Sequence, residues 1–163
     1  MLQRVQTIFM TIAAISMVLV LFFPIWEMSK YTEGDVQGEY LILNARELRH
    51  ELRNPNNDIL EVKAVKSTIP ISIGAVLSAL VMFWSITRYK SRMTQIKLNS
   101  LFSLLISGIL VGIIIYIRKF DPQLTGSPLF GGILIIVAMI NNMIANRFIR
   151  KDEQLVRSAD RIR

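Results

Sequence analysis

Four apolar stretches without a single Asp, Glu, Lys, Arg or His constrain this chain more than any other feature of its sequence. They cover about residues 5–26, 69–87, 98–117 and 129–145. A helix needs about 20 predominantly apolar residues to cross the hydrocarbon core of a bilayer. The sequence therefore predicts an all-α membrane protein, a four-transmembrane-helix bundle that forms one domain over residues 1–163.

The composition favours the same class. Hydrophobic residues make up 52% of the 163 residues, the mean hydropathy is +0.44, and the charges lie in blocks between the apolar stretches. The net charge of +7 is typical of basic residues that gather on one side of a membrane. We expect no nucleic-acid partner, because no basic patch with interleaved aromatic residues is present.

The first apolar stretch is predicted to stay attached as a membrane anchor. Arg4 precedes it, as a basic residue precedes a signal peptide, but the stretch is too long for one. It also ends in the bulky residues 22–26, which do not suit signal-peptide cleavage.

A polar segment, residues 27–68, follows and is predicted to form a small cap outside the membrane. Residues 39–43 and 59–65 resemble short β-strands. Ala45, Leu48 and Leu52 recur at helical spacing, so we also expect a helical turn.

The orientation follows from the loop between the second and third stretches. Residues 88–97 contain four basic residues and no acidic ones, and short basic loops remain in the cytoplasm. Four crossings then place both termini in the cytoplasm as well. The cap is expected on the opposite side of the membrane, which is the periplasm in a Gram-negative cell.

Small residues recur four apart within the second and third stretches. Such pairs lie on one helix face and let two helices approach closely. Two interpretations stay open: packing within the bundle, or a seam between two copies of the chain. The candidates are Gly74, Ser78, Ser103, Ser107, Gly108 and Gly112.

Asn141 and Asn142 interrupt the fourth stretch. Adjacent residues point about 100° apart on a helix, so we expect one of the two to bond a neighbouring helix. The alternative is a polar pocket in the cytoplasmic half of the bundle, with Asn146 extending the same polar face.

The C-terminal tail, residues 146–163, is predicted to continue the fourth helix as a basic amphipathic extension. Phe148, Leu155, Ala159 and Ile162 share one face of it. The tail and the basic loop are expected to contact anionic lipid headgroups, or a partner subunit instead. The candidate contact residues are Arg88, Lys90, Arg92, Lys97, Arg147, Arg150, Lys151, Arg157 and Arg161.

No pattern in the sequence predicts catalysis. His50 is the one histidine and cysteine is absent, so neither a Cys-ligated metal nor thiol chemistry is expected. Phosphate-binding loops and hydrolase motifs are also missing from the sequence. We therefore expect no enzyme activity, no catalytic residue, no metal and no cofactor.

The two ends of the chain resemble a known bacterial family of small four-helix membrane proteins. The similarity lies in residues 1–7 and 21–24, in the middle loop with Lys90, Arg92, Gln95 and Lys97, and in residues 149–163. The chain is similar there to the domain-of-unknown-function family 4293. The resemblance implies four spans and a location in the bacterial inner membrane, and it implies no known activity. Residues 27–68 are the least family-like part.

Together these features predict a non-enzymatic structural or accessory subunit of a membrane complex. Its partners would be membrane lipids and other membrane subunits. The alternative is a protein that binds or transports a lipid or small apolar solute within the helix bundle.

Overall fold

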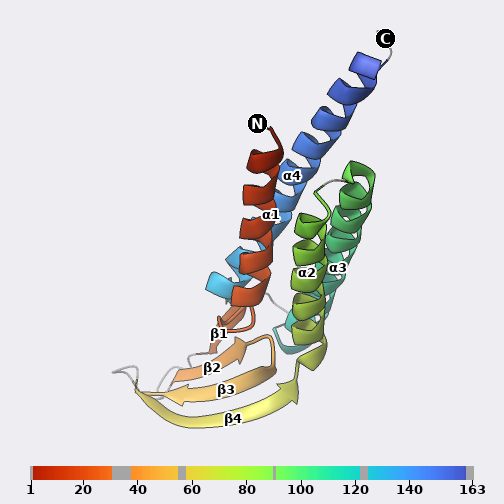
Figure 1. Ribbon diagram of the computed structural model, residues 1–163. Helices are drawn as coiled ribbons and strands as arrows, with labels where there is room; N and C mark the ends of the chain where they lie inside the picture. The colour runs from red at the N-terminus through yellow and green to blue at the C-terminus, as the bar shows by residue number, and fades with distance from the viewer. Residues whose placement is uncertain (1, 31–37, 55–57, 90, 122–124, 161–163) are drawn as a thin grey trace.

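Four long helices lie side by side, and a β-sheet covers one end of them (Figure 1). This computed structural model describes residues 2–30, 38–54, 58–89, 91–121 and 125–160. Both termini lie at the end of the helices opposite the sheet, and we call these two ends the terminal end and the sheet end. The helices are α1 (Leu2–Leu19), α2 (Ile69–Thr87), α3 (Arg92–Phe120) and α4 (Phe130–Asp160).

Three of the helices are long and apolar enough to cross a membrane: α2, α3 and the Phe130–Val156 part of α4. The 19 residues of α2 rise about 28 Å, close to the thickness of the hydrocarbon core. α1 is also apolar, but its Val5–Leu19 part is shorter. α3 begins at Arg92, so half of the predicted basic loop belongs to this helix.

A five-stranded antiparallel sheet corrects the predicted all-α fold class. Its strands are β1 (Trp26–Lys30), β2 (Gly38–Leu43), β3 (Glu47–Arg53), β4 (Ile59–Ser67) and β5 (Ser127–Pro128), in the order β4-β3-β2-β1-β5. The first four strands come from the segment that was expected to form a small cap. β5 comes from the connection between α3 and α4, which the sequence analysis treated as a loop.

The helical turn predicted around Ala45, Leu48 and Leu52 is also wrong. Leu48 and Leu52 belong to β3, and Ala45 lies in the turn between β2 and β3. A spacing of four residues places two side chains on one face of a helix, but it does the same on a strand, where every second residue shares a face.

The helices pack through small and flexible side chains. α1 contacts α4 and α2, and α3 contacts α2 and α4. Met10, Ala13 and Met17 of α1 are fully buried, as are Ala138 and Ala145 of α4. Alanines on α4 allow the long methionine side chains of α1 to fill the space between the helices.

Hydrogen bonds fix the sheet to the helix ends. The Thr68 hydroxyl, just before α2, donates to the Asn44 carbonyl oxygen at 2.7 Å, and the Ser72 hydroxyl donates to that of Ala45 at 2.6 Å. The Gly131 N–H at the start of α4 donates to the Pro24 carbonyl oxygen at 2.8 Å. The β2–β3 turn (Asn44–Arg46) and the start of β1 are therefore held against helices.

Candidate functional site

A cluster of buried polar side chains joins α2, α3 and α4. The Ser85 hydroxyl donates to Oδ1 of Asn99 at 2.7 Å, and Nε2 of Gln95 donates to the Ser85 carbonyl oxygen at 3.1 Å. Nδ2 of Asn142 donates to the Asn99 carbonyl oxygen at 3.2 Å and to the Ser103 hydroxyl at 2.7 Å. We call these five residues the polar cluster.

The spacing of these residues explains why they meet. Gln95, Asn99 and Ser103 are each four apart on α3 and therefore form one stripe along the helix. Asn142 faces the middle of this stripe from α4, and Ser85 faces its upper part from α2. The sequence analysis named Ser103 and Asn142 as site candidates and Gln95 only as part of the family resemblance, and it missed Ser85 and Asn99. Gln95, Asn99 and Ser103 recur every four residues, and this period was the signal that could have identified Gln95 and Asn99 as site residues.

Several amide atoms in this region are buried without a hydrogen-bond partner among the described residues. They include Oε1 of Gln95, Nδ2 of Asn99 and Oδ1 of Asn142, and also Oε1 of Gln6 and Oδ1 of Asn146. Buried polar atoms of this kind can bind water or a small polar molecule. Hydroxyls and carboxamides are neutral at physiological pH, so the cluster joins helices but offers no group to transfer a proton.

The two predicted asparagines differ in what they bind. Asn142 is 1% exposed and bonds α3, whereas Nδ2 of Asn141 donates to the Val137 carbonyl oxygen of its own helix at 2.8 Å. Asn146 lies one turn beyond Asn142 and is half-buried.

The small residues also divide into two groups. A Cβ atom on Gly74 of α2 would lie 2.8 Å from Cγ1 of Ile109 on α3, so these helices touch at that glycine. The hydroxyls of Ser78 and Ser107 bond the carbonyl oxygens four residues before them. A Cβ atom on Gly108 or Gly112 would meet nothing within 4 Å, so among the described residues these two glycines leave open space where a side chain would begin.

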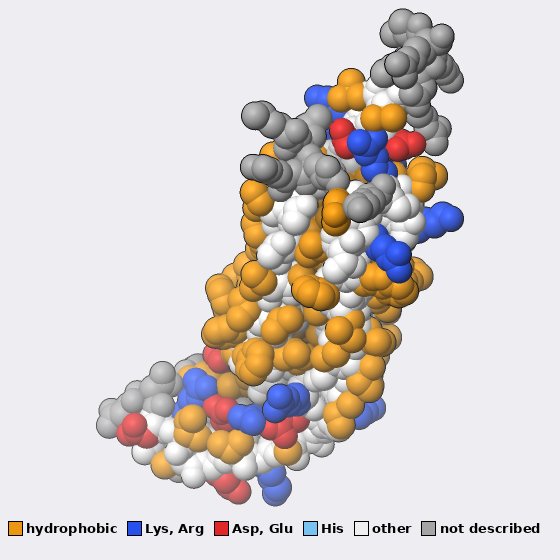
Figure 2. Space-filling model, viewed as in Figure 1, with side chains coloured by type: hydrophobic (Ala, Val, Ile, Leu, Met, Phe, Trp, Pro, Cys, Tyr) orange, Lys and Arg blue, Asp and Glu red, His pale blue; other side chains and the backbone are white. Residues whose placement is uncertain are grey.

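The basic candidates gather at the terminal end of the helices (Figure 2). Nε of Arg92 pairs with Oδ2 of Asp152 at 3.0 Å and so ties α3 to α4. The Arg88 guanidinium lies 5.9 Å from the centre of the Trp84 ring. The remaining described candidates are exposed, namely Lys97, Arg147, Arg150 and Lys151. Lys90, Arg161 and the side chain of Arg157 lie outside the described residues.

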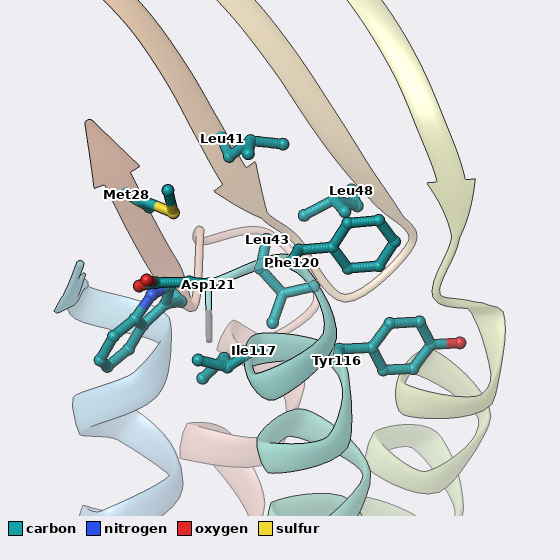
Figure 3. Close-up of a pocket in the computed structure, with 9 residues that line it drawn as sticks. Met28, Leu41, Leu43, Leu48, Tyr116, Ile117, Phe120 and Asp121 are labelled. Carbon is teal, nitrogen blue, oxygen red and sulfur yellow. The ribbon is translucent and has the colours of Figure 1, made fainter. Parts of the chain in front are cut away.

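At the sheet end, one face of the sheet packs on the end of α3. Met28, Leu41, Leu43 and Leu48 project from the strands toward the last turn of α3 (Figure 3). The space between them is about 10 Å³, which is room for about one water molecule. This contact is therefore a closed apolar core rather than a binding site.

Asp121 follows the last residue of α3 beside this core and binds Thr125 and Gly126. Its carboxylate accepts hydrogen bonds from the Thr125 N–H at 3.0 Å, the Thr125 hydroxyl at 3.1 Å and the Gly126 N–H at 2.8 Å. Burial disfavours the charged form, but these bonds outweigh burial and hold the pKa of Asp121 below its ordinary value. The charged carboxylate thus holds Thr125 and Gly126, the two residues just before β5.

The surface also has open grooves, and the sequence analysis predicted none of them. An apolar groove of about 570 Å³ runs between α1 and α2 along the outer surface of the helices. A second groove of about 490 Å³ crosses the other face of the sheet and contains Arg46, Arg49 and Arg53. Leu21 lines both grooves. Their residues are far apart in the sequence, so no local pattern could show that they meet.

The described residues hold no group of three or more His, Cys, Asp or Glu side chains that could bind a metal ion. His50 lies on β3, with Nε2 3.5 Å from Oε2 of Glu39.

The model of the family described as Domain of unknown function (DUF4293) matches residues 2–162, nearly the whole chain. No curated protein matches the chain.

Proposed function

We propose that this chain, which belongs to the DUF4293 family, is a multi-pass protein of the bacterial inner membrane that serves as a structural or accessory subunit. Four helices cross the bilayer, both termini lie in the cytoplasm, and the sheet lies on the outer side. The protein has no catalytic activity of its own.

Crossing by α1 is supported by its contacts with α4. The Phe9 and Phe148 rings stack with centroids 5.8 Å apart, and Phe23 and Phe130 meet edge to face at 4.9 Å. Phe9 lies in the first half of α1, and Phe23 lies four residues after its last residue, Leu19, so α1 runs along α4 between Phe148 and Phe130. A helix packed in this way shares the environment of its neighbour.

The orientation is supported by the charges at the terminal end. Exposed Lys97, Arg147, Arg150 and Lys151 lie there, and basic residues flanking membrane helices are enriched on the cytoplasmic side.

The observation that carries the accessory role is the edge strand β4. All nine of its residues are exposed, and Ile59, Leu60, Val62 and Val65 are each about half exposed. A long apolar edge strand is a liability unless something covers it. The neutral polar cluster and the absence of charged residues in the apolar stretches favour a supporting role over catalysis.

Single cysteines test the topology cleanly, because the natural sequence contains none. We expect an impermeant maleimide to label Lys63→Cys on β4 in spheroplasts, and to label Arg150→Cys on α4 only after the membrane is permeabilised. Labelling of Arg150→Cys in intact spheroplasts would contradict the proposed orientation.

Native electrophoresis of gently solubilised membranes tests the accessory role. The tagged chain should migrate within a larger assembly, and Val62→Lys on β4 should release it. Lys63→Gln, on the same strand, is the matched control and should leave the assembly intact. A chain that migrates alone, with neither partner nor lipid, would refute the proposal.

A further inference from the structure

The junction of the two grooves has the chemistry of a lipid-binding site. We propose that it binds one anionic glycerophospholipid from the leaflet on the sheet side, with an acyl chain in the α1–α2 groove and the phosphate at Arg46. This inference rests on the membrane crossing proposed above.

The α1–α2 groove fits one acyl chain. It extends from Thr11 to Leu19 on α1, continues to Leu21 just after this helix, and runs from Val76 to Ile86 on α2. Ten residues of helix rise about 15 Å, which is about half of the hydrocarbon thickness, and on α2 the groove begins about two turns beyond Ile69. The residues that line the groove are almost all apolar, and the small side chains of Ala14 and Ala79 are among them.

Arg46 is placed where the headgroup of such a lipid would lie. It belongs to the β2–β3 turn, which Thr68 and Ser72 pin to the start of α2. Arg46 lines the groove on the sheet together with Leu21 and Phe22, which follow α1. It also lines another groove, together with Ile69 of α2. Arg46 therefore lies between the end of α1 and the start of α2.

The ion pairs of the sheet groove leave this one arginine available. Arg49 pairs with Glu47 at 2.5 Å, and Arg53 pairs with Glu51 at 2.7 Å. Arg46 is exposed, and its side chain has no ion pair or hydrogen bond within the described parts of the chain. A guanidinium is well suited to bind phosphate.

The surface agrees with this arrangement. Figure 2 shows the apolar surface of the helices giving way directly to a band of basic and acidic side chains over the sheet. An amphiphile with one apolar and one anionic part matches this boundary. A soluble phosphate would use only the arginine, and an uncharged lipid only the apolar groove.

Native mass spectrometry of the full-length protein in detergent can test the site, with phosphatidylglycerol and phosphatidylcholine added separately. We expect more phosphatidylglycerol than phosphatidylcholine to be retained. Arg46→Gln should lower the retention of phosphatidylglycerol about fivefold, whereas Lys63→Gln, which removes the same charge outside both grooves, should not.

A second pair of variants tests the acyl groove. Ala79→Phe fills the groove and should lower the retention of phosphatidylglycerol. Ser107→Phe, on an exposed position of α3 outside the groove, should leave it unchanged. Millimolar inorganic phosphate should not displace the lipid.

Three results would overturn the inference. They are equal retention of the two lipids, equal behaviour of Arg46→Gln and Lys63→Gln, and equal behaviour of Ala79→Phe and Ser107→Phe. Displacement by inorganic phosphate would instead identify an anion site without a lipid. Maleimide labelling reports the topology independently, so failure of the lipid site is distinguishable from failure of the proposed membrane crossing.

Discussion

Gly74 shows how a single residue can set a helix contact that its sequence pattern describes only loosely. The sequence contains small residues at several similar spacings, and all of them were candidates for close packing. Only the structure separates the two positions: a Cβ atom on Gly74 would lie 2.8 Å from Ile109, whereas one on Gly108 would meet nothing within 4 Å among the described residues. The four-residue spacing of the small residues was predictable from the sequence. Which of these small residues face a neighbouring helix depends on how the helices pack.

We therefore predict opposite outcomes for two identical substitutions. Gly74→Ala adds a methyl group where Ile109 lies 2.8 Å away, and overpacking of this kind costs about 1–3 kcal/mol. Gly108→Ala adds the same group in open space and gains helix propensity. Unfolding in detergent titrated with SDS should show a less stable Gly74→Ala and an unchanged or more stable Gly108→Ala.

A second single residue, Asp121, leads to a prediction about the pH dependence of stability. Its pKa is lowered in the folded protein, so its contribution to stability is complete above the unfolded pKa, about 3.9. That contribution is lost as the pH falls through the lower folded pKa. Asp121→Asn cannot accept the same bonds as strongly and should cost about 2 kcal/mol at pH 7.

Thermal unfolding at pH 7 and at progressively lower pH measures this difference. The stability gap between the natural protein and Asp121→Asn should narrow once the pH falls below about 4. Glu61→Gln, a charge change on the exposed strand β4, is the control and should show no such gap. A gap that stays constant with pH would argue against a charged Asp121.

Among the elements, those with a strong local pattern were predictable and the others were not. β2 and β4 carry the alternation of strands, and both were anticipated approximately. β3 was mistaken for a helical turn because Leu48 and Leu52 satisfy both periods. β5 has two residues and forms only because Trp26 and Glu27 offer a partner, so the sequence contains no local signal for it.

The contact between α3 and α4 also depends on particular side chains. Asn142 donates to two groups on α3, whereas Asn141 donates only to its own helix. Asn142→Leu should therefore weaken the contact by about 0.6 kcal/mol or more. Asn141→Leu is the matched control and should change the SDS unfolding curve little. Equal effects of the two substitutions would mean that the polar cluster does not hold these helices together.

Viewed as a whole, the molecule joins its sheet and helices into one unit at the β2–β3 turn. Thr68→Val and Ser72→Ala together remove both side-chain bonds to this turn, each worth about 1 kcal/mol. Amide hydrogen exchange should then accelerate in β2 and β3 while the centre of α2 stays protected. Ser100→Ala, which removes a hydroxyl bonded within α3, should leave exchange in the sheet unchanged.

The apolar helices were predictable because the charged residues lie between four charge-free stretches of the sequence, and three of the described helices are long and apolar enough to span a membrane. The complete sheet was not, because β3 was mistaken for a helical turn and β5 joins β1 only across α2 and α3. The arginine-rich groove was also hidden, since it needs residues 21–24 beside residues 42–53. Such long-range neighbours have no periodicity in the sequence.

The pairing of β5 with β1 has a consequence for biosynthesis. Trp26 leaves the ribosome long before Pro128, its partner in the sheet. The edge of β1 that pairs with β5 therefore stays unpaired during synthesis of three strands and two helices. Any product released before the loop after α3 has a β1 that lacks its last neighbour. The sheet can therefore be completed only after synthesis has reached the beginning of α4.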